Sequence, residues 1–254
     1  MPDLLIDTTD RVMTITLARV AKKNAFTRAM YADLADALYS AETDDAVRAV
    51  VIQGHESVFS AGNDLADFTQ PDADFENSPV FLFMRAISRF PKPVVAAVSG
   101  PAVGIGTTLL FHCDLVYASD TAAFAMPFVN LGLCPEAASS LLAPLRMGHG
   151  RAAQALLLGE PFRAEDALEM GLVARVVPPA EVHALAQAQA RKLAAKPLPS
   201  LVETKRLLKQ TWADAVANRI GDEARIFARM LGEPPAQEAV AAFLGKRAPD
   251  FSRF

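Results

Sequence analysis

Cysteine is scarce in this chain, and its two cysteines, Cys113 and Cys134, belong to no CxxC pair and no Cys/His ligand spacing. The sequence therefore offers neither a disulfide framework nor a zinc motif. No apolar run approaches the ~18 residues that a membrane-spanning helix needs. The first residues, MPDLLIDTTD, are acidic and lack the basic and apolar regions of a secretion signal. These absences predict a cytoplasmic protein with no membrane partner.

Basic charge is also limited. The 254 residues carry 25 Lys and Arg against 29 Asp and Glu, a net charge of −4. Nucleic-acid binding needs a basic face for phosphate contacts, so we expect no nucleic-acid partner. The histidines share no ligand or triad spacing, which gives no sign of a metal site; they are His55, His112, His149 and His183. Hydrophobic residues make up 52% of the chain, which is long enough to bury one large core.

Strand and helix patterns alternate through the first half of the chain. Helical periodicity covers residues 28–42, behind Thr27 as a capping residue, and residues 80–90. Short apolar or alternating runs that are typical of strands fall at residues 11–18, 47–54, 93–100, 114–119, 122–127 and 173–177. This alternation predicts an α/β fold with mostly parallel strand pairing and right-handed crossovers.

The pattern becomes mostly helical from residue 135 onward. Two prolines interrupt it in KPLPS (196–200), which makes this segment the best candidate for a boundary. We predict a core of residues 1–195 and a C-terminal helical region of residues 196–254. A short run of amphipathic helices forms a poor core by itself, so this region is expected to pack on another domain or subunit.

Two glycine turns follow predicted strands in a similar way. FSAGNDL (59–65) comes after the strand at 47–54, and GPAVGIGTTLL (100–110) comes after the strand at 93–100. Ligands of open α/β sheets bind at the carboxyl ends of parallel strands, where one N–H from each turn would form an oxyanion hole. The second turn lacks the third glycine of a dinucleotide fingerprint and the GK[ST] of a P-loop. The alternative is that these glycines only permit tight strand-to-helix packing.

Four ordered segments resemble the crotonase, or enoyl-CoA hydratase/isomerase, superfamily. They are FSAGNDL, GPAVGIGTTLLFHCDLVYAS (100–119), ARVAKKNAF (18–26) and LGEPFRAEDALEMGLVARVV (158–177). The resemblance implies an α/β crotonase-like spiral of ββα units with a helical C-terminal trimerisation region, assembled as a homotrimer or a dimer of trimers. It implies an acyl-CoA thioester as substrate, so that coenzyme A is part of the substrate and no separate cofactor is needed. It assigns the oxyanion hole to the backbone N–H groups of Asn63 and Ile105.

The same resemblance suggests which residue is the base. The family's hydratases carry two glutamates at positions that here hold Thr108 and Phe128, and neither side chain can titrate near the reacting carbons. The Δ3,Δ2-enoyl-CoA isomerase branch instead places one glutamate where Glu136 stands, although Ala137 replaces the glycine that is common there. A single base that flanks C2 and C4 is enough to shift a double bond. We therefore expect Glu136 to be catalytic, although a Pro-Glu pair is also a common way to start a helix.

The remaining assignments concern coenzyme A and the acyl chain. Lys22 and Lys23 are candidate contacts for the CoA phosphates, although a basic pair on a loop is often simply solvated. By resemblance to the family, the backbone near the adenine is assigned to Ala61, Asp64 and Leu65. The candidate acyl pocket, with plain core packing as the alternative, consists of Phe128, Thr108, Phe81 and Met84.

The sequence is compatible with three functions. The leading one is an isomerase of fatty acid metabolism that converts 3-enoyl-CoA to 2-enoyl-CoA. The second is an enoyl-CoA hydratase or another crotonase-type acyl-CoA enzyme, and the third is a non-catalytic acyl-CoA-binding trimer. Double-bond migration, hydration of crotonyl-CoA and binding without turnover distinguish them.

Overall fold

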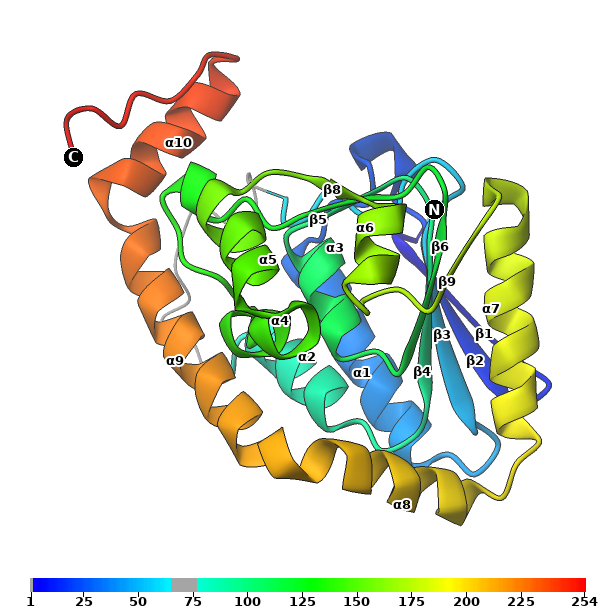
Figure 1. The fold of residues 1–254 in the computed structure, drawn as a ribbon. Helices are drawn as coiled ribbons and strands as arrows, with labels where there is room; N and C mark the ends of the chain where they lie inside the picture. The colour runs from blue at the N-terminus through cyan, green and yellow to red at the C-terminus, as the bar shows by residue number, and fades with distance from the viewer. Residues whose placement is uncertain (1, 65–76) are drawn as a thin grey trace.

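A large twisted sheet forms the centre of the molecule, with helices on both of its faces (Figure 1). The computed structural model describes residues 2–64 and 77–254, and within them this sheet has six strands in the order β1-β2-β3-β4-β6-β9. β1 runs antiparallel to β2, and the other neighbours are parallel. The strands are β1 (Leu4–Thr9), β2 (Val12–Leu17), β3 (Ala49–Gln53), β4 (Val94–Val98), β6 (Leu115–Ser119) and β9 (Arg175–Val177).

A smaller sheet stands beside the large one. In the described residues it has the three strands β5 (Pro101–Val103), β7 (Ala123–Ala125) and β8 (Phe162–Arg163), in that order. β5 pairs in parallel with β7, and β8 pairs antiparallel with β7. Because β5 begins only three residues after β4 ends, the chain passes directly from the large sheet into the small one. This crossing point carries the second glycine turn.

Helices cover the two faces of the large sheet unequally. α7 lies alone on one side in Figure 1, and α1, α2 and α3 lie on the other. α7 packs a stripe of small residues, Val182, Ala186, Ala190 and Ala194, against the sheet, as its four-residue spacing predicts. The helices are α1 (Arg28–Thr43), α2 (Pro79–Arg89), α3 (Ile105–Thr108), α4 (Ser139–Met147), α5 (His149–Ala153), α6 (Ala164–Glu169), α7 (Pro179–Ala194), α8 (Leu198–Lys209), α9 (Ala213–Leu231) and α10 (Pro234–Leu244).

α1 shows how local sequence produces an element of the main core. The Thr27 side chain accepts a hydrogen bond from the Met30 N–H at 3.2 Å and so caps the first turn, as predicted. From there Met30, Leu34 and Leu38 face inward and are almost fully buried. Tyr31, next to this stripe, is also fully buried, and it carries a hydroxyl group into the core.

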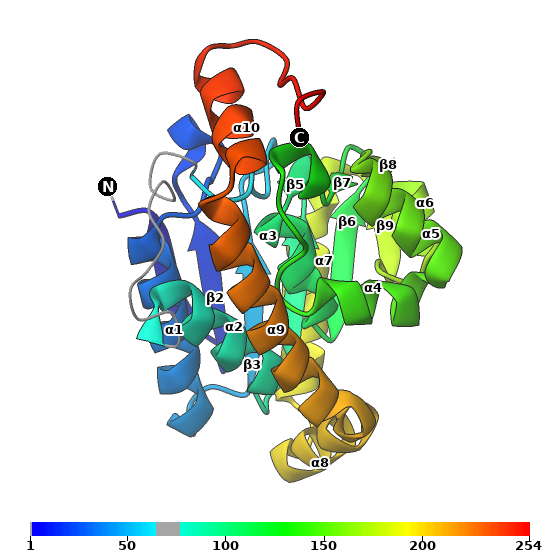
Figure 2. The same ribbon diagram turned by 90° about the vertical axis from the view of Figure 1, so that its left-hand side faces the viewer.

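The C-terminal helices run along one side of the molecule. α8 is anchored by the buried Lys205, whose Nζ lies 2.7 Å from a carboxylate oxygen of Asp114 and donates to the carbonyl of Lys92 at 2.6 Å. α9 then lies against α2 and α4, as Figure 2 shows, and α10 projects beyond them. In the described parts of the chain, no helix combines the length and apolar character needed to cross a membrane.

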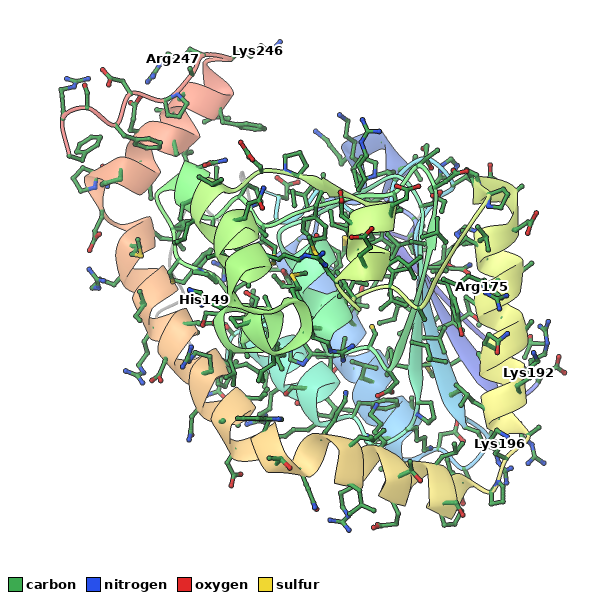
Figure 3. The ribbon with its side chains drawn as sticks, in the orientation of Figure 1. His149, Arg175, Lys192, Lys196, Lys246 and Arg247 are labelled. Carbon is green, nitrogen blue, oxygen red and sulfur yellow. The ribbon has the colours of Figure 1, made fainter. Side chains whose placement is uncertain are left out.

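Several basic side chains lie on separate parts of the surface (Figure 3). Lys192 and Lys196 are at the end of α7, with Arg175 on the same side of the molecule. Lys246 and Arg247 follow α10 on the opposite side. Arg247 is paired there with Glu238, which lowers the pKa of that carboxyl to about 2. These labelled charges therefore do not form one continuous basic face.

The predicted strands and helices of the first half are present, with two differences. Pairing with β2 makes a strand of residues Leu4–Thr9, and pairing with β7 makes a strand of Pro101–Val103, neither of which was predicted. Glu136 precedes a helix as predicted, and the Pro-Glu pair does not itself start that helix, because α4 begins at Ser139. Ala137 and Ala138 intervene with φ angles of 58° and 57°, which a right-handed helix does not allow.

Candidate active site

The two glycine turns adjoin in the fold. Ser60 and Ala102 form a parallel bridge, and the Val103 N–H donates to the Ser60 carbonyl at 2.9 Å. Gly62 has a φ of +93°, and a Cβ there would lie 3.0 Å from the Val103 carbonyl oxygen. Gly104 has a φ of +54°, and a Cβ there would lie 3.9 Å from the Cα of Gly62. Glycine is needed at both positions because of this backbone conformation, and at Gly62 also because of the close approach.

Each turn presents an N–H group directly after its positive-φ glycine. Ile105 is the first residue of α3, where N–H groups have no partner inside the helix. Among the described residues, no carbonyl or side chain accepts a hydrogen bond from the N–H of Ile105 or of Asn63. The Gly104 N–H, in contrast, donates to the Ala125 carbonyl at 2.9 Å. Two free donors on adjoining turns are the components of an oxyanion hole.

A buried asparagine holds the first turn in place. The Asn24 amide donates to the carbonyls of Val58 at 3.2 Å and Phe59 at 3.1 Å. The Ala61 N–H donates to the Lys23 carbonyl at 2.9 Å. The segment ARVAKKNAF therefore supports the turn FSAGND directly through these hydrogen bonds.

The assigned coenzyme-A residues fall on the outer side of this segment. Lys22 and Lys23 are exposed, and Lys23 has a left-handed φ of 52°. The Asp64 carboxylate pairs with Arg19 at 2.7 Å, which connects the end of the turn to the same segment. Leu65 lies outside the described residues. Their contacts with coenzyme A stay a prediction.

Glu136 is a buried carboxylic acid, 4% exposed, on the loop before α4. The side-chain amide of Asn63 donates a hydrogen bond to its carboxylate. The other oxygen, Oε1, has no hydrogen-bond partner in the described part of the chain. Burial, together with the nearby carboxylate of Glu223, raises the pKa of Glu136 to about 8, against the lowering effect of Asn63. A buried acid with a free oxygen and a raised pKa is a candidate general base.

A second buried acid shapes the loop that carries Glu136. The Glu223 carboxylate accepts from the N–H groups of Ala138 at 2.6 Å and Ser140 at 2.9 Å, and from the Ser140 hydroxyl at 2.5 Å. It thereby accepts hydrogen bonds from backbone N–H groups at the start of α4, as a capping side chain does at other helices. Ala137 and Ala138 are held in left-handed conformations that are costly for alanine.

His112 supports the same loop from the other side. Its Nε2 lies 2.8 Å from the carbonyl oxygen of Ala137, and the side chain is buried. Burial, with a further contribution from Lys209, lowers the pKa of His112 to about 4, so the ring is neutral at physiological pH and its Nε2–H donates to this carbonyl. His112 is therefore a packed structural residue that orders the loop next to Glu136.

The two positions where family hydratases have glutamates hold buried, non-acidic side chains. Thr108 is fully buried in α3, and within the described residues its Oγ1 has no partner. Phe128 is buried in the main core. Met84 and Phe81 belong to α2, the first buried in the core and the second half-buried against it. Their role as an acyl pocket stays a prediction.

Sequence reasoning missed three features of this site. It used only the backbone of Asn63, whose side chain contacts Glu136, and it did not consider Tyr31 or Glu223. Glu223 lies between Ile220 and Ala224 on the buried face of α9, and an acid on an apolar stripe is the sequence signal by which it could have been found. In the described residues no group of three or more His, Cys, Asp or Glu is placed to hold a metal ion.

The fold and site together define a class of protein: an α/β protein with two free backbone N–H groups on adjoining glycine turns and a buried carboxylate that contacts one of these turns. Residues 7–253 match the family described as Enoyl-CoA hydratase/isomerase. The chain is therefore a member of the enoyl-CoA hydratase/isomerase family and has the crotonase fold.

Individual relatives are similar over most of the chain. Enoyl-CoA delta isomerase 2 of Rattus norvegicus is 44% identical over 181 residues, which is 69% of this chain but only 46% of that protein. The 1,2-epoxyphenylacetyl-CoA isomerase of Escherichia coli (strain K12) is 37% identical over 252 residues, 95% of each chain. Hydratases are also among the similar proteins. A crystal structure of an enoyl-CoA hydratase/isomerase from Pseudoalteromonas atlantica T6c matches with a TM-score of 0.94 and 41% identity, over 98% of this chain and 100% of that one.

Proposed function

We propose that this protein is a Δ3,Δ2-enoyl-CoA isomerase. Glu136 is its single base, and the N–H groups of Asn63 and Ile105 are its oxyanion hole. The observation that supports the proposal is the hydrogen bond between the Asn63 side-chain amide and the buried Glu136 carboxylate, since the backbone of Asn63 also carries one of the two free N–H groups. The similarity to a delta isomerase supports it.

The reaction needs one base and two proton transfers. Glu136 removes a proton from C2 of a 3-enoyl-CoA, and the C–H electron pair forms a C1=C2 bond while the thioester π pair moves onto oxygen. Asn63 and Ile105 hold that oxygen as a dienolate. When the carbonyl re-forms, C2=C3 forms, and the former C3=C4 pair takes the proton back from Glu136 at C4. The product is 2-enoyl-CoA, and no water enters the reaction.

Energetics and environment fit this division of roles. Each oxyanion donor is worth about 3–4 kcal/mol by mutational precedent, since the donor is already in place when charge develops. A pKa of about 8 makes Glu136 a stronger base than an ordinary carboxylate, and it still ionises near neutral pH. The apolar Phe128 and the neutral Thr108 replace groups that a hydratase uses to activate water.

Substitution of the base tests the proposal. Glu136→Gln keeps the size of the side chain but removes the base, and we expect conversion of 3-enoyl-CoA to 2-enoyl-CoA to fall by roughly 10²–10⁴-fold. Glu203→Gln, at an exposed acid in α8, is the matched control and keeps full activity. Wild-type turnover in Glu136→Gln would exclude this mechanism. Rapid hydration of crotonyl-CoA by the wild type would favour a hydratase, and binding of acyl-CoA with no turnover would favour a binding protein.

Assembly belongs to the same proposal. We infer a homotrimer or a dimer of trimers formed through the C-terminal helices of residues 196–254, in the cytoplasm. Large apolar side chains are exposed on α8 and α10, which is unfavourable unless another surface covers them. They are Leu207, Leu208, Phe243 and Leu244, at 57–77% exposure. Light scattering of the purified protein measures the assembly, and a monomer at micromolar concentration would contradict it.

A further inference from the structure

We propose that Tyr31 is a positioning residue that locks the side-chain amide of Asn63 in the orientation that presents its NH₂ group to Glu136. The inference rests on the proposed function, because it assumes that Glu136 is the base. It adds a group on α1 to a site otherwise built from loops and from the start of α3. The role assigned to Tyr31 is exerted through Asn63, to which its hydroxyl donates.

The contacts form a directed chain. The Tyr31 hydroxyl donates to Oδ1 of Asn63 at 2.5 Å, and the Asn63 amide in turn donates to the Glu136 carboxylate. An amide has an accepting end and a donating end of nearly the same shape, so it can be turned over with little steric change. A hydroxyl that donates to the oxygen end favours the orientation in which the nitrogen end faces Glu136.

Tyr31 is held rigidly enough to impose this choice. Its side chain is fully buried, and its ring centroid lies 5.2 Å from that of Phe26 and 5.6 Å from that of Phe83. Phe26 also pairs with the backbone on both sides of Asn63, through the Gly62 carbonyl and the Asp64 N–H, each at 2.8 Å. The residue that packs on the tyrosine ring therefore also fixes the backbone of Asn63, and with it the oxyanion donor.

The amide orientation matters because few groups stabilise the charge on Glu136. The titratable groups around it are Glu223 from α9, Cys134 on the preceding loop, Tyr31 from α1, and His112, which bonds the next carbonyl. Burial and Glu223 favour the neutral acid, whereas the Asn63 NH₂ group favours the carboxylate. A turned amide would put a carbonyl oxygen against the carboxylate and raise the pKa of Glu136 further.

Tyr31→Phe tests the inference, since it removes only the hydroxyl and keeps the packed ring. We measure the pH dependence of kcat/KM for a 3-enoyl-CoA between about pH 6 and pH 10. We expect the acidic limb to move upward, with a loss of up to roughly tenfold below the transition and recovery of wild-type turnover at high pH. Asn63→Ala, which keeps the backbone N–H, moves the limb in the same direction. Adding Tyr31→Phe to Asn63→Ala produces no further shift.

Controls separate this role from a general structural one. Tyr117→Phe removes a hydroxyl from a buried tyrosine in the core on the other face of the sheet, and it leaves the profile unchanged. A loss in Tyr31→Phe that is equal at every pH, or an additive shift in the double variant, would overturn the proposal. If either result is found and Glu136→Gln is inactive, only the role of Tyr31 is refuted and the proposed isomerase function still stands. An active Glu136→Gln instead refutes the function itself, so the two failures are distinguishable.

Discussion

Glu223 and Ala138 are joined by a hydrogen bond of 2.6 Å between the carboxylate of one and the backbone N–H of the other. This bond connects α9 to the loop that carries Glu136, two residues before Ala138. The Glu223 side chain also engages Ser140, so that one acid from the C-terminal helices holds both the loop and the start of α4. The geometry of the candidate base therefore depends on a helix that carries no other assigned role in the chemistry.

Removal of this carboxylate is expected to loosen the site. Glu223→Ala leaves the N–H groups of Ala138 and Ser140 buried without an acceptor, which costs about 2–4 kcal/mol of unfolding free energy. Isomerase activity falls in parallel because the loop no longer fixes Glu136. Urea denaturation and turnover measure the two effects. Glu203→Ala on the exposed face of α8 is the control, and equal stabilities for the two variants would contradict the role of Glu223.

Ala137 is expected to be a strained residue. Its φ of 58° is unfavourable for alanine, whereas glycine adopts it without strain. Ala137→Gly is therefore expected to leave the free energy of unfolding unchanged or to raise it by up to about 1 kcal/mol. Ala215→Gly, in an exposed part of α9, is expected to have the opposite effect and to lower the free energy of unfolding by about 1 kcal/mol. Thermal unfolding of the two variants compares them directly. A similar loss in both would show that no strain is stored at Ala137.

Protonation of Glu136 makes stability depend on pH in a defined direction. The pKa is raised to about 8 in the folded protein, from an ordinary 4.5, so the folded state keeps a proton that the unfolded chain releases. Stability from this group is therefore complete below about pH 4.5 and is lost as pH rises through about 8.

Glu136→Gln removes this dependence. When the pH is raised from 5 to 9, the free energy of unfolding of the variant increases by roughly 2–4 kcal/mol relative to that of the wild type. Urea unfolding at both pH values measures the difference, and Glu203→Gln, whose acid is exposed, is the control. A constant difference between wild type and Glu136→Gln at the two pH values would show that the buried acid ionises normally.

Gly62 tests the oxyanion hole through backbone geometry. A Cβ at this position meets the Val103 carbonyl oxygen at 3.0 Å, and the φ of +93° is unfavourable for alanine. Gly62→Ala shifts the Asn63 N–H, and kcat/KM is expected to fall on the order of 10²-fold. Gly148→Ala is a matched control, since Gly148 also has a positive φ, of +76°, but nothing lies within 4 Å of its Cβ position. The Gly148→Ala variant is expected to lose stability but to keep its activity.

Some parts of the fold and site follow from neighbouring residues alone. The capped helix of residues 28–43 depends on Thr27 and on a stripe of apolar side chains, and both are visible as spacing. The turns at Gly62 and Gly104 are visible for a similar reason, because only glycine readily takes their backbone conformations. Glu136 was found through the resemblance to a family, since nothing in its immediate surroundings distinguishes it from the start of a helix.

Other parts were decided by tertiary structure. The start of α4 at Ser139 depends on Glu223, 83 residues beyond Ser140, and the Asn63 amide is oriented by Tyr31, 32 residues earlier. The raised pKa of Glu136 comes from burial, which no local pattern specifies. The sequence by itself determined the capped and periodic helices, the strands with a clear apolar pattern and the glycine turns, because caps, periodicity and positive φ act between near neighbours. The tertiary structure decided which side chains meet, because those contacts require elements far apart in the chain to pack together.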